Sequence, residues 1–186
     1  MTGFAFCGSH CTLNAALEAA KRLIEAGEEL LPIFSFSVSG TDTRFFKARD
    51  FCRRAEELCG TRGIYSIVEA EPLGPSRPLD YLIICPCTGN TLARLANGIC
   101  DTPVTMAAKA HLRNGRRILL CPASNDALGA GLKNIAALTV RKGIFFTPMK
   151  QDDPLNKPFS LVTDFNKVPE AFEAMKRDTQ LRPLFL

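Results

Sequence analysis

Short apolar runs alternate with amphipathic segments along the whole chain, and this alternation limits the fold more than any other feature of the sequence. In the first amphipathic segment, Leu13, Leu17 and Ile24 recur at helical spacing and therefore share one face. Strands that alternate with helices are joined by right-handed crossovers, which place helices on both faces of a parallel sheet. The sequence therefore predicts an α/β fold in three layers, with a doubly wound, Rossmann-like parallel sheet. The strands are expected at residues 3–7, 30–36, 64–68, 81–85, 118–121 and 144–146.

The segments between these runs carry the signals of helices and loops. Gly27 follows the first periodic segment, and glycine commonly ends a helix. The chain of 186 residues fits one domain, residues 1–186, with residues 147–186 as a C-terminal tail and helix. Helices are expected at residues 13–24, 45–58, 91–97, 104–113, 127–141 and 169–177, and loops at 37–43, 71–78 and 147–158.

The charge and hydropathy of the chain exclude several classes of partner. The 23 basic and 19 acidic residues give a net charge of +4, without a block of like charges. This charge is too small and too dispersed for nucleic-acid binding, although it suits a small anionic ligand. No apolar run approaches the roughly 18 residues that a membrane span needs, and no signal peptide is evident. We therefore expect a cytoplasmic protein without a nucleic-acid or membrane partner.

Eight cysteines are the one unusual count. A chain of this length and apolar content needs no disulfide framework, so we expect reduced thiols, mostly in the core. The spacing of Cys7, Cys11, Cys85 and Cys87 matches no recognised zinc site. The adjacent acids at 152–153 are expected to form a turn or a subunit contact, so no metal is expected. Only Cys11 and Cys87 remain of functional interest.

Small polar side chains follow four of the predicted strands. In a doubly wound sheet, ligands bind beyond the carboxyl ends of the strands. Hydroxyl and amide groups there, together with the free N–H groups of helix N-termini, can hold a phosphate. Each segment alone is also typical of turns and helix caps, as for Asn125 and Asp126, but four at one edge predict a binding site. The segments are residues 8–11, 35–37, 86–91 and 122–126.

The familiar nucleotide and hydrolase motifs are missing from the sequence. No G-x-G-x-x-G follows the first strand, and the second strand ends in Ser35 rather than in an acid that would hold a ribose. No Walker lysine loop or nucleophile elbow occurs, and His10 and His111 have no evident triad partner. His111 is expected on the surface of a helix. A phosphate-bearing cofactor other than a nicotinamide dinucleotide is therefore expected.

Residues 86–91, P-C-T-G-N-T, resemble the P-A-S-A-N-T motif of the flavin-binding cysteine decarboxylase family. The resemblance implies a flavoprotein fold and contacts from this motif to FMN and to substrate. The catalytic histidine of that family has no counterpart, because Arg44 stands in its place, and its substrate clamp keeps only Pro122 and Asn125. Decarboxylation of a cysteine is therefore not expected. The cofactor-binding positions implied are Gly8, Ser9, Ser35, Thr88, Asn90, Thr91, Ser124 and Asn125.

Seven separated segments resemble, in order, the dipicolinate synthase B-subunit family, which is flavoprotein-like and comes from spore-forming bacteria. The resemblance implies a part in the oxidation of a cyclic dihydrodipicolinate-type dicarboxylate to dipicolinate during sporulation. It also implies a partner, the A subunit of dipicolinate synthase, which carries the NAD(P) site and on which activity depends, and a homo-oligomer built from trimers. The segments are residues 8–12, 43–45, 70–75, 88–90, 106–110, 124–129 and 151–154.

A dicarboxylate substrate needs fixed cations, and arginine can grip a carboxylate through two hydrogen bonds. Arg44 is the preferred cation, ahead of Lys109, Arg113 and Lys157. His10 lies in the first loop, where it could act as acid or base, bind a phosphate, or make only a structural hydrogen bond. The catalytic candidates are Asn90, Arg44 and His10.

Two other functions stay open. The chain could be a non-catalytic binding or scaffold protein that completes the active site of the A subunit. It could also be a flavin prenyltransferase-like enzyme, because residues 156–160 are similar to the R-P-x-S stretch of those enzymes. The residues expected to hold a prenyl phosphate are not all matched, which disfavours the second alternative.

Overall fold

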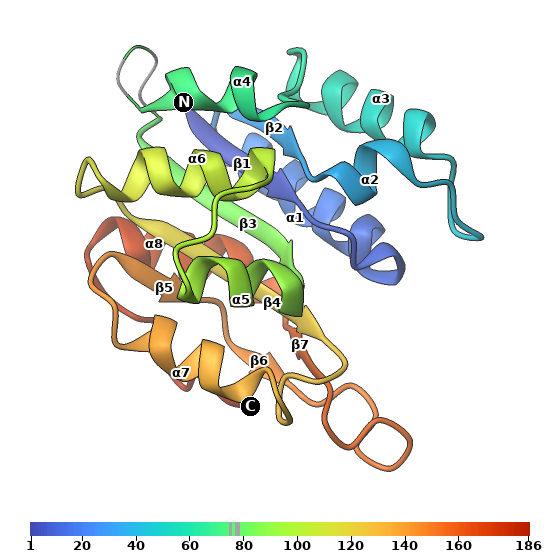
Figure 1. Ribbon diagram of the computed structural model, residues 1–186, viewed down its shortest axis with the longest axis vertical. Helices are drawn as coiled ribbons and strands as arrows, with labels where there is room; N and C mark the ends of the chain where they lie inside the picture. Colours follow the sequence, from blue (N-terminus) through green and yellow to red (C-terminus); the bar gives the residue numbers. More distant parts are fainter. Residues whose placement is uncertain (75, 77–78) are drawn as a thin grey trace.

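A seven-stranded sheet forms the centre of the molecule in the computed structural model, which describes residues 1–74, 76 and 79–186 (Figure 1). Five strands are parallel in the order β2-β1-β3-β4-β5, and β7 and β6 extend the sheet in antiparallel fashion. The strands are β1 (Thr2–Phe6), β2 (Leu30–Phe34), β3 (Tyr81–Cys87), β4 (Ile118–Ser124), β5 (Ile144–Phe146), β6 (Met149–Lys150) and β7 (Leu161–Thr163).

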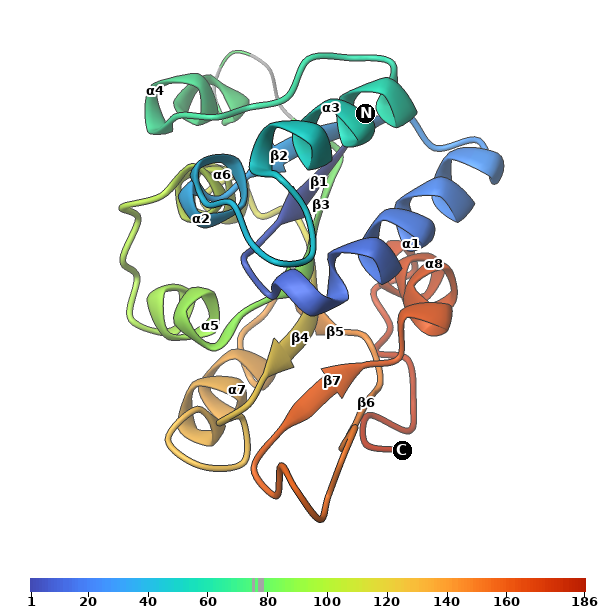
Figure 2. The same cartoon turned by 90° about the vertical axis from the view of Figure 1, so that its right-hand side faces the viewer.

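Helices cover both faces of the sheet, as expected for a three-layer α/β fold. In Figure 2, α5, α6 and α7 lie on one side of the strands, and α1 and α8 lie on the other. None of the helices in the described part of the chain is long and apolar enough to cross a membrane. The helices are α1 (Leu13–Glu25), α2 (Phe36–Gly40), α3 (Ala48–Cys59), α4 (Ile67–Ala70), α5 (Gly89–Ala96), α6 (Pro103–Leu112), α7 (Leu132–Thr139) and α8 (Val168–Lys176), with 3-10 turns at His10–Thr12, Glu71–Leu73 and Phe165–Lys167.

Each face of the sheet buries its own apolar cluster, which explains the continuous apolar runs in the sequence. On one face, Phe6 packs with ring centroids 5.8 Å from Phe34 and 5.3 Å from Phe51. On the other face, Leu82 and Ile84 pack against the helices that follow β3 and β4. Side chains of adjacent strand residues thus enter opposite clusters, and the strand ends are held rigidly between them.

The strand order reverses between β1 and β3. The chain first moves outward from β1 to β2, then returns past β1 to β3 and continues to β4. The crossovers leave β1 and β3 in opposite directions, so a crevice opens between them at their carboxyl ends. The loop at 41–47 and the loop between β6 and β7 both project beyond this edge, on the right of Figure 1.

Several expected boundaries differ from the structure. Residues 64–68 do not form a strand: Ile64 makes only an isolated bridge to Ile33. A capping box between Ser66 and Glu69 instead begins α4. Part of the expected loop at 37–43 belongs to α2, and the connection at 71–78 contains a 3-10 turn, while residues 75, 77 and 78 lie outside the described residues.

The C-terminal tail is more ordered than the sequence indicates. Residues expected to be loop include β6, and β7 follows at Leu161–Thr163, where no strand was expected. These strands are two and three residues long, too short for a periodic pattern. The expected helix at 127–141 is confined to Leu132–Thr139, because a tight turn over residues 126–131 precedes it.

His111 lies in the core and is 1 % exposed, so the expectation of a surface position is wrong. Its Nε2 lies 2.9 Å from the carbonyl oxygen of Arg117, and its Nδ1 is buried without a hydrogen-bond partner among the described residues. Burial lowers the pKa of His111 to about 4.

We expect His111 to make stability depend on pH between about 6.5 and 4. As the pH falls through this window, His111 binds a proton in the unfolded chain but not in the folded protein. The free energy of unfolding therefore falls by about 2–3 kcal/mol. The measurement is urea unfolding at several pH values for the wild type and for His111→Gln. Identical pH profiles for the two proteins would contradict the prediction.

Candidate functional site

A cleft of about 910 Å³ opens at the carboxyl ends of β1 to β4. Its volume lies within the range of cofactor sites. All ten residues predicted from the sequence line it, although they come from four separate strand ends. They are Gly8, Ser9, His10, Ser35, Arg44, Thr88, Asn90, Thr91, Ser124 and Asn125.

At the β1 and β2 end, the cleft wall is formed by small groups. The Ser35 and Ser37 hydroxyls lie 3.1 Å apart, and a Cβ added at Gly8 would overlap the Ser37 hydroxyl. The backbone N–H groups of Gly8, His10 and Cys11 have no hydrogen-bond acceptor among the described residues. These three residues line the cleft, where free N–H groups are suited to an anion.

His10 lies beside Gly8, with its Nε2 3.4 Å from the position that a Cβ at Gly8 would take. Its Nδ1 is buried without a hydrogen-bond partner in the described part of the chain, and its ring lies 5.8 Å from that of Phe46. Burial lowers the pKa of His10 below the usual value of 6.5. The imidazole is therefore mainly neutral near pH 7, and one of its two nitrogens can accept a proton.

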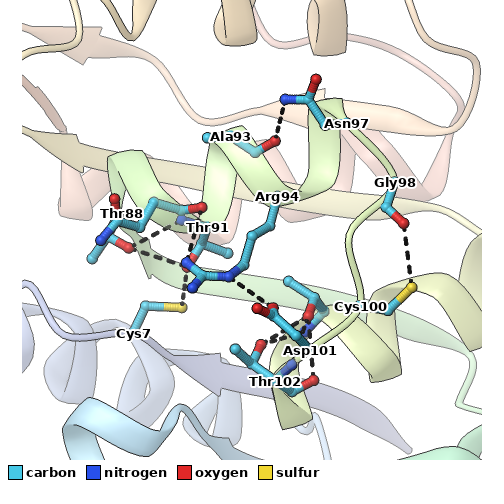
Figure 3. Close-up of polar contacts among 12 residues, drawn as sticks. Cys7, Thr88, Thr91, Ala93, Arg94, Asn97, Gly98, Cys100, Asp101 and Thr102 are labelled. Carbon is cyan, nitrogen blue, oxygen red and sulfur yellow. Dashed lines mark hydrogen bonds and ion pairs between the residues drawn. The ribbon is translucent and has the colours of Figure 1, made fainter.

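At the β3 end, Thr88 begins α5 and fixes its first turn. The Thr88 hydroxyl accepts a hydrogen bond from the Thr91 N–H at 3.3 Å, and the Thr91 hydroxyl donates to the Cys7 sulfur at 3.4 Å (Figure 3). Burial raises the pKa of the Cys7 thiol to about 11. The side chain of Cys7 is therefore a neutral link between β1 and α5, and the loop geometry is fixed from both strands.

Arg94 also lines the cleft, although it is not among the residues predicted from the sequence. Its Nε donates to Asp101 Oδ1 at 2.8 Å, which ties α5 to the connection before α6, as Figure 3 shows. The spacing in the sequence could have predicted this position, because Arg94 lies four residues after Asn90 and therefore on the same helix face.

At the β4 end, Ser124 donates a hydrogen bond of 2.6 Å to Asp126 Oδ1, and Asn125 is exposed beside them. A Cβ added at Gly89 would lie 2.6 Å from the Ser124 hydroxyl oxygen and 3.1 Å from Asp126 Oδ1. The lack of a side chain at Gly89 therefore keeps this carboxylate accessible from α5.

The loop between β6 and β7 closes one side of the cleft. Lys157 Nζ lies 2.8 Å from Asp152 Oδ2, and both residues line the cleft with Ser160. Hydrogen bonding to Lys157 is the main cause that lowers the pKa of Asp152, so the pair is ionised at neutral pH. Asp153 accepts from the N–H of Asn156, so the acids at 152 and 153 do form a turn.

The other predicted cations differ in position. Arg44 is exposed at the mouth of the cleft, with its guanidinium carbon 4.9 Å from the Phe45 ring centroid. No carboxylate in the described part of the chain pairs with it. Lys109 and Arg113 lie outside the cleft, on and just after α6, so the structure does not bring them to the site.

The cysteines are free thiols, and most are buried. Cys87 is fully buried, and burial raises its pKa well above the usual value, whereas Cys11 is exposed at the edge of the cleft. The described residues contain no group of three or more His, Cys, Asp or Glu side chains that could hold a metal ion.

The flavoprotein family model matches residues 39–167, which is more than half of the chain. The B subunit of dipicolinate synthase from Bacillus subtilis (strain 168) is 43% identical over 184 residues, covering 99% of this chain and 92% of the relative. The chain belongs to the flavoprotein family, among the dipicolinate synthase B subunits.

Solved structures of this flavoprotein family agree with the fold. A crystal structure of the dipicolinate synthase B subunit from Bacillus halodurans C has a TM-score of 0.91 and 39% identity, and covers 100% of this chain and 95% of that one. A dodecameric FMN-dependent Ubix-like decarboxylase from Escherichia coli O157:H7 has a TM-score of 0.64 and 25% identity over 79% of each chain. The α/β fold predicted from the sequence is thus confirmed.

In this family member, the missing side chain of Gly8 is expected to matter for stability. Gly8→Ala places a methyl group on the Ser37 hydroxyl and forces the Ser35–Ser37 pair apart, at a cost of about 1–3 kcal/mol in the free energy of unfolding. Denaturant unfolding measures the change. Gly40→Ala is the control, because a Cβ there meets nothing within 4 Å. Equal stability of the two variants would contradict the prediction.

Proposed function

We propose that the chain acts as the B subunit of a dipicolinate synthase. In this function it takes part in the oxidation of a cyclic dihydrodipicolinate-type dicarboxylate to dipicolinate during sporulation, through an FMN site at the strand ends. The observation that carries the proposal is the convergence of four strand ends on one cleft, in a chain that matches a dipicolinate synthase B subunit over 99% of its length.

The residues of the cleft fit FMN. The free N–H groups beside Gly8, with the hydroxyls of Ser9, Ser35 and Ser37, can bind a phosphate without a cationic side chain. The amide and hydroxyl groups at the other strand ends suit a polar ring, and Gly89 leaves room beside them. When bound, FMN supplies a two-electron acceptor. The residues proposed to hold it are Gly8, Ser9, Ser35, Thr88, Asn90, Thr91, Ser124 and Asn125.

The substrate is bound by the side chains at the mouth of the cleft. Arg44 grips one carboxylate, because its guanidinium is exposed there and no described carboxylate neutralises it. Asn90, at the start of α5, donates and accepts hydrogen bonds that orient the ring. His10 binds the phosphate or accepts a proton in its neutral form. Lys157 is a weaker binder, because Asp152 already engages it.

The proposed assembly includes a second type of chain. The A subunit of dipicolinate synthase binds NAD(P) and is required for activity, and this chain forms a homo-oligomer built from trimers in the cytoplasm. The exposed side chains of Phe36 (50%) and Phe45 (48%) support a covering partner, because they lie at the cleft mouth. The dodecameric assembly of the Escherichia coli relative also supports a homo-oligomer.

FMN binding distinguishes a flavin site from a pure scaffold. Titration of the purified chain with FMN, followed by quenching of flavin fluorescence, is expected to saturate. Asn90→Ala is expected to raise the dissociation constant about 5–100-fold, the effect of losing one or two hydrogen bonds worth about 1–3 kcal/mol. Asn14→Ala, on the exposed face of α1, serves as the control. Absence of saturable binding would overturn the flavin site and leave the scaffold function.

Arg44 is expected to act on substrate affinity rather than on the chemical step. In a dipicolinate-forming assay with the A subunit, Arg44→Ala raises KM about 10–100-fold with little change in kcat, because a charge-assisted contact to a spectator carboxylate is lost. Arg44→Lys recovers only part of the affinity, since lysine cannot bind in bidentate fashion. Lys109→Ala, outside the cleft, is the control. An unchanged KM in Arg44→Ala would remove Arg44 from the substrate site.

A further inference from the structure

A carboxylate without a cationic partner lies in a cleft otherwise suited to anions. Two acids line the cleft, and Asp152 is neutralised by Lys157 at 2.8 Å. The Asp126 carboxylate accepts only the hydrogen bond from Ser124 and pairs with no cation in the described part of the chain. Asp126 is also exposed, so its carboxylate is open to a ligand that enters the cleft.

The backbone around Asp126 is held rigidly. Its carbonyl oxygen accepts hydrogen bonds from the N–H groups of Gly129 at 2.9 Å and Gly131 at 3.0 Å. The N–H of Leu128 donates to the Phe159 carbonyl at 2.9 Å, which ties the turn to the loop before β7. The Ser124 hydroxyl then fixes Oδ1 at 2.6 Å. The carboxylate is thus oriented before any ligand arrives, as proton transfer requires.

A substrate can reach the carboxylate from the side of α5. The lack of a side chain at Gly89 leaves this approach open, because a Cβ there would lie 3.1 Å from Oδ1. Ser124 uses one oxygen of the carboxylate, whereas Oδ2 has no hydrogen-bond partner among the described residues. Because Asp126 lines the cleft, its carboxylate has an oxygen free to accept a proton from a ligand bound there.

We propose that Asp126 is the general base that removes a carbon-bound proton from the ring during oxidation. This inference rests on the proposed function. One ring C–H bond gives a hydride to the hydride acceptor of the synthase, a flavin or a nicotinamide. A second ring C–H bond breaks, its proton passes to the Asp126 carboxylate, and its electron pair becomes the new ring double bond. The ring loses one hydride and one proton in total, which is the two-electron change of aromatisation.

The other titratable groups of the cleft are less suited to this role. The ends of β1 and β4 are two strand spacings apart, about 10 Å, and His10 Nε2 lies beside Gly8 rather than at the β4 end. Asp152, the other acid that lines the cleft, is paired with Lys157. Cys11 and Arg44 lie at the β1 and β2 end with His10.

The test compares Asp126→Asn with the wild type in the complex with the A subunit. We expect kcat to fall at least 100-fold, the usual effect of losing a general base. Calorimetric titration with dipicolinate, which needs no turnover, is expected to give equal or several-fold tighter binding, because the repulsive charge is gone. Asp126→Glu is expected to restore part of the rate, and Ser124→Ala to lower it less than Asp126→Asn does. Asp50→Asn, in an exposed pair on α3, is the control.

The outcomes separate this inference from the function on which it rests. If the wild-type complex forms dipicolinate and the kcat of Asp126→Asn falls less than 100-fold, Asp126 is not the base, while the proposed function stands. If Asp126→Asn loses dipicolinate binding in parallel with its rate, Asp126 has a binding role and the inference is overturned. If the wild-type complex forms no dipicolinate, the proposed function and the inference both fail.

Discussion

The parallel pairing of β1 with both β2 and β3 is the constraint on which the site depends. Parallel strands end at the same edge, and the reversal of direction at β1 opens a crevice there. The apolar clusters on the two faces hold these strands, so the loops after them begin from fixed points. The hydrogen bond from Thr91 to the buried Cys7 then couples the two strand ends that border the crevice.

The shape of the cleft depends on two glycine positions as much as on the side chains that line it. A methyl group at Gly8 would overlap Ser37, and one at Gly89 would press on Ser124 and Asp126. Each glycine therefore leaves polar groups of a neighbouring strand exposed to the cleft. Hydroxyls and N–H groups become the lining, and binding of an anion needs few fixed cations.

The sequence predicts the parts of the molecule in which burial imposes a pattern. The continuous apolar runs of β1, β3 and β4 and the polar segments after them were correctly located, and these positions brought the ten predicted residues to one cleft. Short elements were missed because they are too short for a repeating hydrophobic pattern, as for β7 with its three residues. Where a strand was expected at 64–68, a capping box between Ser66 and Glu69 begins a short helix instead. The burial of His111 was missed because its polar side chain and basic neighbours suggested a surface position, although it lies on a buried face of α6.

The arrangement of charge also explains why the sequence alone does not show which charged side chains of the cleft are free. Two ion pairs form in the folded chain, Lys157 with Asp152 and Arg94 with Asp101. The spacing of these residues in the sequence predicts neither pair. What remains is an unpaired cation, Arg44, after β2 and an unpaired carboxylate, Asp126, after β4, at opposite ends of the cleft in the described part of the chain. Such a polarised cleft attracts the anionic end of a ligand toward Arg44 and away from Asp126. The ion pairs that neutralise the other charged side chains therefore leave one positive and one negative group in the cleft, and these two set its electrostatic polarity.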